Sequence, residues 1–402
     1  MSQQESLEQP IFAQEVERDR PEPEVPRFDT KTILKHLTLF ALTFGCVSFV
    51  GIMWVGHTAQ AETYWDMLGQ GAVFATLLLS FLGVHEFGHY FAAMYHHVRT
   101  TLPYFIPVPI GIGTFGAVIR IKEKVKDSIK LFDIGIAGPL SGFVVALGLL
   151  LYGFATLPDP SFIMNFDGHE PIQQYVQQHG AFPDQPVSEP NGSLLMVGET
   201  LLYSFLAQFF ENVPPMWEMY HYPFLFAGWL GLFFTALNLT PIGQLDGGHI
   251  LYSLLGYRRH RLIARVFFCV LTILAGVGAV PLLHSSLGGY DNSYATLSWL
   301  IWGLVLFFLL RKAYHKEHRW IAPATAISLA GSAFLLFNFY GGVDTTGSLM
   351  WVVWSFFLAY LIGLEHPPAL VERPLDRTRT ILGWTSMAIF ILCISPNPLY
   401  FI

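Results

Sequence analysis

Hydrophobic residues follow one another along this chain in long runs, and the charged residues stand in the gaps between the runs. Ten stretches hold at least 19 successive residues without Asp, Glu, Lys or Arg. A helix needs about 20 mostly apolar residues to cross a bilayer, so each stretch is a candidate membrane span. The stretches are 36–61, 67–85, 100–119, 134–158, 219–245, 266–290, 292–310, 320–343, 345–364 and 380–402.

The stretch 100–119 does not have the composition of a helix. Proline removes helix donors and glycine favours turning backbone, and this stretch has three of each: Pro103, Pro107, Pro109, Gly111, Gly113 and Gly116. We therefore expect a small membrane-associated β hairpin or loop after the second helix. Nine helices remain, and the predicted fold is an all-α polytopic membrane protein with about nine transmembrane helices.

The positions of Lys and Arg test this count independently. Basic residues occur before the first helix and then in every second loop, and none occurs in 57–70, 158–221, 284–295 or 341–347. Cytoplasmic loops are enriched in Lys and Arg. The alternation predicts a cytoplasmic amino terminus and an outer carboxyl terminus.

The polar segments divide the chain further. Residues 1–30 have no apolar periodicity and are expected to form a disordered cytoplasmic tail. Residues 158–221 are expected to form an external insert. Within it, 194–212 resembles an amphipathic segment lying on the outer interface or entering it without crossing.

Composition narrows the possible functions. Of 402 residues, 53% are hydrophobic and 13% are charged, against about 25% charged in soluble domains. The net charge is −7 and no long basic stripe exists, so we expect no nucleic-acid partner. Cys46, Cys269 and Cys393 stand far apart in apolar stretches, which predicts neither disulfides nor a cysteine metal site.

The second span ends in the sequence His85-Glu86-Phe87-Gly88-His89. Residues four apart share one face of a helix, so His85 and His89 could hold one Zn²⁺ while Glu86 reaches the water it activates. A span that starts near Gly71 places this group about 20 Å below the outer surface. A carboxylate at that depth must be paired, hydrated or near a cation. The alternative is a Glu86 that pairs with a neighbouring His for packing only.

A catalytic zinc site needs a third protein ligand. Asp246 is the other acid at comparable depth, towards the cytoplasmic end of the fifth span, in NLTPIGQLDGGH. Pro241 and Gly243 interrupt the helix there, as happens where backbone lines a cavity. Zn²⁺ with Asp246 and either Glu86 or hydroxide is neutral overall, which low dielectric favours. His249, one turn further on, is an alternative ligand.

Taken together, these motifs resemble the site-2 protease (peptidase M50) family of intramembrane zinc metalloproteases. The resemblance covers about residues 71–256. It implies that His85, His89 and Asp246 bind one Zn²⁺, that Glu86 is the general base and that Asn238 holds the scissile carbonyl or its oxyanion. Ala137-Gly138-Pro139-Leu140 resembles the family's Gly-Pro element. We expect Gly138 to serve in helix packing. No segment is long enough for a PDZ domain, so the resemblance is to the PDZ-free branch.

The resemblance also implies a division of the chain and a class of partner. Residues 31–256 would form the protease core, including the insert 158–221, and 257–402 would form carboxyl-terminal membrane helices of unassigned role. The active site would lie nearer the cytoplasmic face. The partners would be the lipid bilayer and transmembrane protein substrates.

A substrate helix must unwind before its peptide bond can be cut, and its freed backbone then needs partners. We expect Thr114–Ile121 to offer an edge strand, with the substrate paired along Gly116, Ala117, Val118 and Ile119. The alternative is a loop that only plugs the cavity.

Two other functions remain open. A transporter or ion-binding membrane protein would also have broken helices and buried acids. A catalytically inactive homologue could bind membrane helices without cutting them. The first does not require Glu directly after the first of two His residues, and the second does not require an intact ligand and base set.

Overall fold

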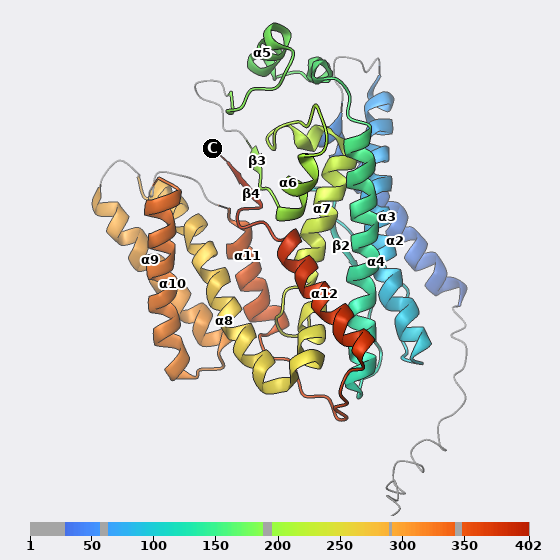
Figure 1. Ribbon diagram of the computed structural model, residues 1–402, viewed down its shortest axis with the longest axis vertical. Helices are drawn as coiled ribbons and strands as arrows, with labels where there is room; N and C mark the ends of the chain where they lie inside the picture. The colour runs from blue at the N-terminus through green and yellow to red at the C-terminus, as the bar shows by residue number, and fades with distance from the viewer. Residues whose placement is uncertain (1–28, 57–62, 188–194, 289–291, 342–347, 402) are drawn as a thin grey trace, which may run out of the picture.

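The computed structural model describes residues 29–56, 63–187, 195–288, 292–341 and 348–401. Almost all of the expected tail 1–30 therefore lies outside the described residues. The described chain is mainly helical, with helices standing side by side and two small sheets between them (Figure 1).

Each of the nine predicted spans overlaps a helix in the described part of the chain. Within the described residues, six helices are long and apolar enough to cross a membrane, whereas α7, α11 with its continuation η3, and α12 are shorter. The all-α polytopic membrane fold is confirmed. The helices are α2 Thr30–Val55, α3 Tyr64–Tyr95, α4 Ser128–Ala155, α7 Pro223–Asn238, α8 Asp246–Ser286, α9 Asn292–Ala313, α10 His318–Phe339, α11 Met350–Phe357, η3 Leu358–Ile362 and α12 Arg377–Cys393.

Polar residues mark where the first three of these helices begin. The side chains of Asp29 and Asp127 accept hydrogen bonds from first-turn amides of α2 and α4. At the start of α3, the Thr63 backbone N–H and hydroxyl both donate to Asp66. Such caps satisfy amide groups that have no partner within the helix.

Helices α2, α3, α4 and α7 form one bundle, held close by glycines. A Cβ on Gly71 of α3 would lie 2.1 Å from the Ser48 carbonyl oxygen of α2. A Cβ on Gly228 of α7 would lie 2.7 Å from Leu150 of α4. Small residues let membrane helices approach backbone to backbone, so this bundle is closely packed.

Helices α8, α9, α10 and α11 form a second group beside the first (Figure 1). Helix α8 bends at Gly256, whose φ of 74° and ψ of 170° are not helical. Helix α12 then returns across the first bundle, where the Arg379 guanidinium pairs with Asp133 of α4 at 2.7 Å.

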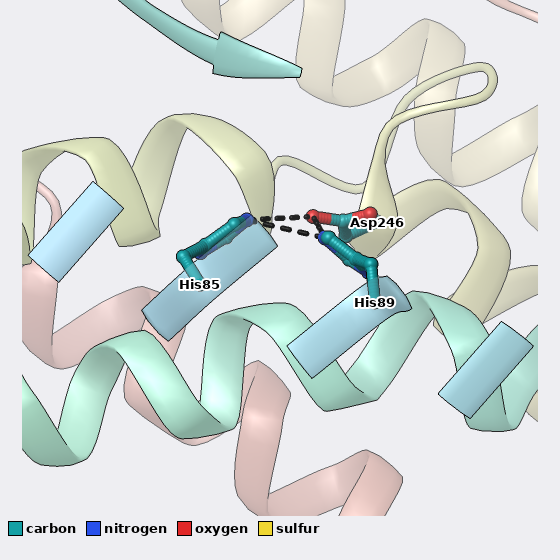
Figure 2. Close-up of side chains that lie close together, drawn as sticks. All are labelled: His85, His89 and Asp246. Atoms are coloured by element: carbon teal, nitrogen blue, oxygen red, sulfur yellow. Dashed lines mark hydrogen bonds and ion pairs between the residues drawn. The ribbon is translucent and has the colours of Figure 1, made fainter. Parts of the chain in front are cut away.

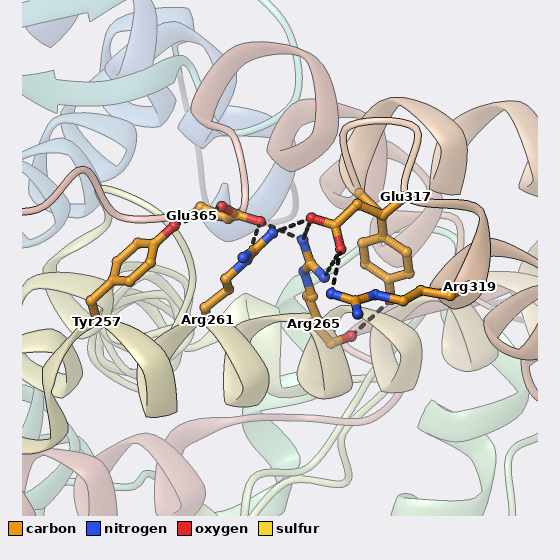
Figure 3. A network of polar contacts seen from close by, with 7 residues as sticks. Tyr257, Arg261, Arg265, Glu317, Arg319 and Glu365 are labelled. Carbon is orange, nitrogen blue, oxygen red and sulfur yellow. Dashed lines mark hydrogen bonds and ion pairs between the residues drawn. The ribbon is translucent and has the colours of Figure 1, made fainter.

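An ion-pair network joins the ends of this second group (Figure 3). Arg265 of α8 donates to Glu317, which precedes α10, and to Glu365, which follows η3, at 2.8 and 2.6 Å. Arg261 contacts the same two carboxylates. The Arg265 hydrogen bonds lower the pKa of Glu317 to about 2. Segments that the charge pattern placed on one side of the membrane therefore lie at the same end of the molecule.

The expected hairpin after the second helix is present. Strands β1 Tyr104–Pro107 and β2 Thr114–Val118 pair antiparallel, with Tyr104 opposite Val118. Among the described residues β1 is the only strand paired with β2, so the other edge of β2 has no strand beside it.

The described residues between α4 and α7 fold into short elements. Within 194–212, the segment expected to be amphipathic, the described residues include β3, which pairs with β4 at the far end of the chain, and the short helix α6. Two three-residue strands so distant in sequence leave no readable periodic pattern. The pieces are η1 Pro160–Asn165, α5 Glu170–His179, β3 Leu195–Val197, α6 Leu201–Ala207 and η2 Met219–His221, with β4 at Leu399–Phe401.

Candidate metal centre

His85 and His89 project from one face of α3, inside the first bundle (Figure 2). The four-residue spacing places their Nε2 atoms 3.2 Å apart. Both side chains are buried, as the apolar run around them predicts.

Asp246 approaches these histidines because α7 stops early. The predicted span 219–245 is too long: α7 ends at Asn238 and a turn follows. Pro241 lies in this turn, and Gly243 has a φ of 56°, a left-handed conformation that favours glycine. The Gly243 amide donates to the Leu364 carbonyl at 2.9 Å, which fixes the turn. Asp246 is therefore the first residue of α8 and not the end of the preceding helix.

The three side chains form a nearly equilateral triangle of potential ligand atoms. Asp246 Oδ2 lies 3.6 Å from His85 Nε2 and 3.2 Å from His89 Nε2. Ligands about 2.0–2.2 Å from a tetrahedral zinc ion lie about 3.3–3.6 Å from one another. The dimensions of the triangle therefore fit one Zn²⁺.

The backbone of α4 orients His89 through a hydrogen bond, and glycines of α4 pack closely against both imidazole rings. His89 Nδ1 lies 2.7 Å from the Ile134 carbonyl oxygen, which can only accept, so Nδ1 carries the proton and Nε2 keeps its lone pair for a metal. A Cβ on Gly138 would lie 2.1 Å from His89 Nε2, and one on Gly142 would lie 3.0 Å from His85 Nδ1. The packing partner of Gly138 is thus the imidazole itself. The position of Gly138 in Ala-Gly-Pro indicated a helix contact but not that the contact is with the His89 ring. Nothing in the sequence indicated the role of the Ile134 carbonyl.

Glu86 and Asn238 flank the triangle. Glu86 is buried, with 8% of its surface exposed, and the backbone of Ile119, just beyond β2, lies near its carboxyl group. Asn238 Nδ2, on the last residue of α7, lies 3.3 Å from His85 Nε2. The carboxyl and the amide both adjoin the place where the triangle would hold an ion.

The other candidate histidine has a different partner. His249 Nδ1 lies 2.8 Å from Nε2 of His366, which comes from the segment between η3 and α12. His249 is therefore not part of the triangle. Sequence reasoning missed His366, because no spacing rule connects positions 117 residues apart.

The expected substrate strand lies beside this site. Gly116, Ala117 and Val118 belong to β2, and Ile119 follows it. Ala117 is buried, while Phe115 and Val118 are exposed at 75% and 48%. The geometry thus combines three ligand atoms, a buried carboxyl group and a strand edge within one helical bundle.

The region that holds this arrangement is similar to a known protein family. The family model for peptidase family M50 matches residues 73–278, which is more than half of the chain and includes the whole triangle. The chain belongs to peptidase family M50. The resemblance to site-2 proteases is thereby confirmed. The region that matches the family runs from α3 into α8.

Plant proteins are among the M50 relatives of this chain. "Probable zinc metalloprotease EGY2, chloroplastic" of Oryza sativa subsp. indica is 27% identical over 274 residues, covering 66% of this chain and 42% of the relative. "Probable zinc metalloprotease EGY1, chloroplastic" of Arabidopsis thaliana is 31% identical over 182 residues, covering 44% and 29%. The chain thus spans less than half the length of the curated relatives it matches. No solved structure matches it.

Proposed function

We propose that this chain is an intramembrane zinc metalloprotease that hydrolyses peptide bonds in or near the transmembrane helices of membrane-protein substrates, the reaction of regulated intramembrane proteolysis. One observation carries the proposal: two imidazole nitrogens and a carboxylate oxygen lie 3.2–3.6 Å apart beside a buried Glu. The printed names of the relatives, zinc metalloprotease, support the choice of metal.

In this proposal His85, His89 and Asp246 hold one Zn²⁺. The ion supplies Lewis acidity, which polarises the scissile carbonyl and activates water. Three protein ligands leave one position open, as catalytic zinc sites require. Burial of both histidines keeps bulk water from their Nε2 atoms.

Glu86 and Asn238 act on the reacting groups. The Glu86 carboxylate accepts a proton from the attacking water and later donates it to the leaving amine. The Asn238 amide, next to His85, donates to the scissile carbonyl oxygen as negative charge develops there.

The free edge of β2 is the proposed place for the unwound substrate. A substrate in extended form would pair with backbone groups of Gly116, Ala117, Val118 and Ile119. The nearness of the Ile119 backbone to Glu86 supports this placement, because the end of the strand then lies next to the base.

We also propose the orientation that the charge pattern predicts. The amino terminus would be cytoplasmic. The end of the first bundle that carries Lys130 and the end of the second helix group that carries Arg265 would face the same side of the membrane. The active site would then lie nearer the cytoplasmic face. Accessibility of single cysteines introduced at exposed Lys126 and Gln177 to an impermeant reagent would distinguish the two sides.

A transporter or ion-binding protein also places acids in broken helices. A transporter has no need of a carboxyl group next to the first histidine or of a strand end near that carboxyl group, and both are present here. An inactive homologue that only binds membrane helices remains the more serious competitor, and activity separates the two.

Glu86→Gln in the reconstituted full chain is the test. A tagged single-span peptide with a helix-weakening Asn-Gly pair serves as probe, and zinc content is measured in both proteins. Loss of the general base should slow cleavage about 10²–10⁴-fold while zinc stays bound. Undiminished cleavage by the variant would contradict the role of Glu86. Absence of cleavage by the parent chain over a panel of such peptides would favour the inactive homologue.

A further inference from the structure

A second cluster of two imidazoles and a carboxylate lies at the opposite end of α7. His169 directly precedes α5, Glu218 directly precedes η2, and His221 is the last residue of η2. One ligand atom from each lies within 4.8 Å of the others. Helix α7 begins two residues after His221 and ends at Asn238, so its 16 residues separate this cluster from the first by about 24 Å.

The cluster has nearly the dimensions of the first triangle. His169 Nε2 and His221 Nε2 are 3.0 Å apart. Glu218 Oε2 lies 3.5 Å from His169 Nε2 and 3.6 Å from His221 Nε2. Three corners of a zinc tetrahedron lie about as far apart.

Hydrogen bonds on the far side of each ring determine which nitrogen faces inwards with a lone pair. His221 Nδ1 lies 2.8 Å from the Trp54 carbonyl oxygen, and His169 Nδ1 lies 3.0 Å from the Asp167 carbonyl oxygen. A carbonyl only accepts, so each Nδ1 carries the ring's proton in the neutral form. Both Nε2 atoms then present lone pairs to each other, which is unfavourable without a cation between them.

Glu218 adds an independent observation. Its side chain is 0% exposed, and neither carboxyl oxygen has a hydrogen-bond partner. Burial raises the pKa of this carboxyl group to about 8. A wholly buried carboxyl group without donors needs a cation or a proton nearby.

We infer that His169, Glu218 and His221 form a second metal site, which binds one Zn²⁺ and fastens the insert to the membrane bundle. Nitrogen and oxygen ligands in a tetrahedral arrangement suit zinc among the divalent ions. Glu218 Oε1 or a water would occupy the fourth position.

The location explains what such an ion would do. In the described part of the insert, the region around α5 has a small core of its own with five buried hydrophobic residues, Ile163, Phe166, Ile172, Val176 and Trp217. So small a core gives little stability without a staple. An ion on His169 would tie this core to the start of α7 through His221 and to the end of α2 through the Trp54 carbonyl.

The metal content of the full chain tests the inference. We would disable the first triangle by His85→Ala with His89→Ala, equilibrate the purified protein with excess Zn²⁺, remove loose metal and measure zinc. We expect one Zn²⁺ per chain, and a fall to background when Glu218→Gln is added. His179→Ala is the matched control, since this exposed imidazole lies on the same α5 and outside the cluster; it should retain the ion.

Two results would overturn the inference. One is a chain with His85→Ala and His89→Ala that remains folded but holds no zinc. The other is zinc that survives Glu218→Gln undiminished, which would indicate adventitious surface binding. This outcome does not depend on proteolysis. A chain that cleaves no substrate, or whose first triangle binds no metal, would still lose the ion of the second site with Glu218→Gln.

A second measurement needs no substitution at the cluster. The segment 158–187 has no Lys or Arg, so chymotrypsin is used in place of trypsin. Chymotryptic cleavage within this segment should increase when a chelator is added to the chain with His85→Ala and His89→Ala. It should decrease again when Zn²⁺ is restored. If the imidazoles and carboxyl group share only a proton, cleavage will be the same with and without metal, and the site does not exist.

Discussion

The two triangles of imidazole and carboxylate have similar sides, 3.2–3.6 Å and 3.0–3.6 Å, but different supports. In the first, His85 and His89 stand on one long helix, and α4 packs its glycines against their rings. In the second, all three residues come from the ends of short elements. The first is held by the bundle whether or not metal is bound, whereas the second depends on its ion to hold the insert in place.

The first way to break this comparison is to disturb the support of the first triangle from α4. Gly138→Ala would place a Cβ 2.1 Å from His89 Nε2 and force the ring to move. A shift of about 1 Å in a catalytic group costs about 10²-fold in rate. We expect that loss in cleavage of the tagged peptide, together with weaker zinc binding.

Gly148→Ala is the matched control on the same helix, because a Cβ there meets nothing within 4 Å. Its activity and zinc content should equal those of the parent. Equal activity of the Gly138 variant would mean that α4 does not hold the ring, and the two triangles would then not differ in support.

The second prediction concerns the edge of β2, the strand beside the first triangle. Val118→Pro removes a backbone donor from β2. We expect cleavage of the transmembrane peptide to fall about tenfold, about the value of one hydrogen bond, with zinc unchanged. Val118→Thr keeps the donor and the β-branched shape and should cleave normally. Unchanged turnover by the proline variant would refute strand pairing.

The third and smallest expected effect separates the two supports by hydrogen exchange. Removing zinc from the full chain should speed amide exchange in α5 severalfold, since a bound ion stabilises only in proportion to the logarithm of its excess over Kd. Amides around His85 in α3 should keep their rates, because their helix is packed on α2 and α4. Faster exchange in α3 than in α5 would reverse the comparison.

The sequence predicted the first triangle because its chemistry follows short-range rules. The spacing of His85 and His89 fixes a shared helix face, and the cost of an acid in the membrane singled out Asp246. The length of the uncharged run did not show that α7 stops at Asn238, because none of the residues of the turn is charged.

The second triangle could not be predicted in the same way. His169 and Glu218 are 49 residues apart in short elements whose mutual approach depends on tertiary packing. Only Glu218 and His221, three apart, left a local signal, and such a pair is common by chance. The pairing of β3 with β4 and of His249 with His366 were missed for the same reason.

The most direct test of the account is zinc X-ray absorption on the full chain carrying Glu218→Gln, in which only the first triangle would bind metal. The account predicts one ion per chain with imidazole nitrogen and carboxylate oxygen neighbours at about 2.0–2.2 Å. Its signal should vanish when Asp246→Ala is added. A folded chain that binds no zinc, or an ion with sulfur neighbours at about 2.3 Å, would contradict the claim that α3 and α8 together form the metal centre.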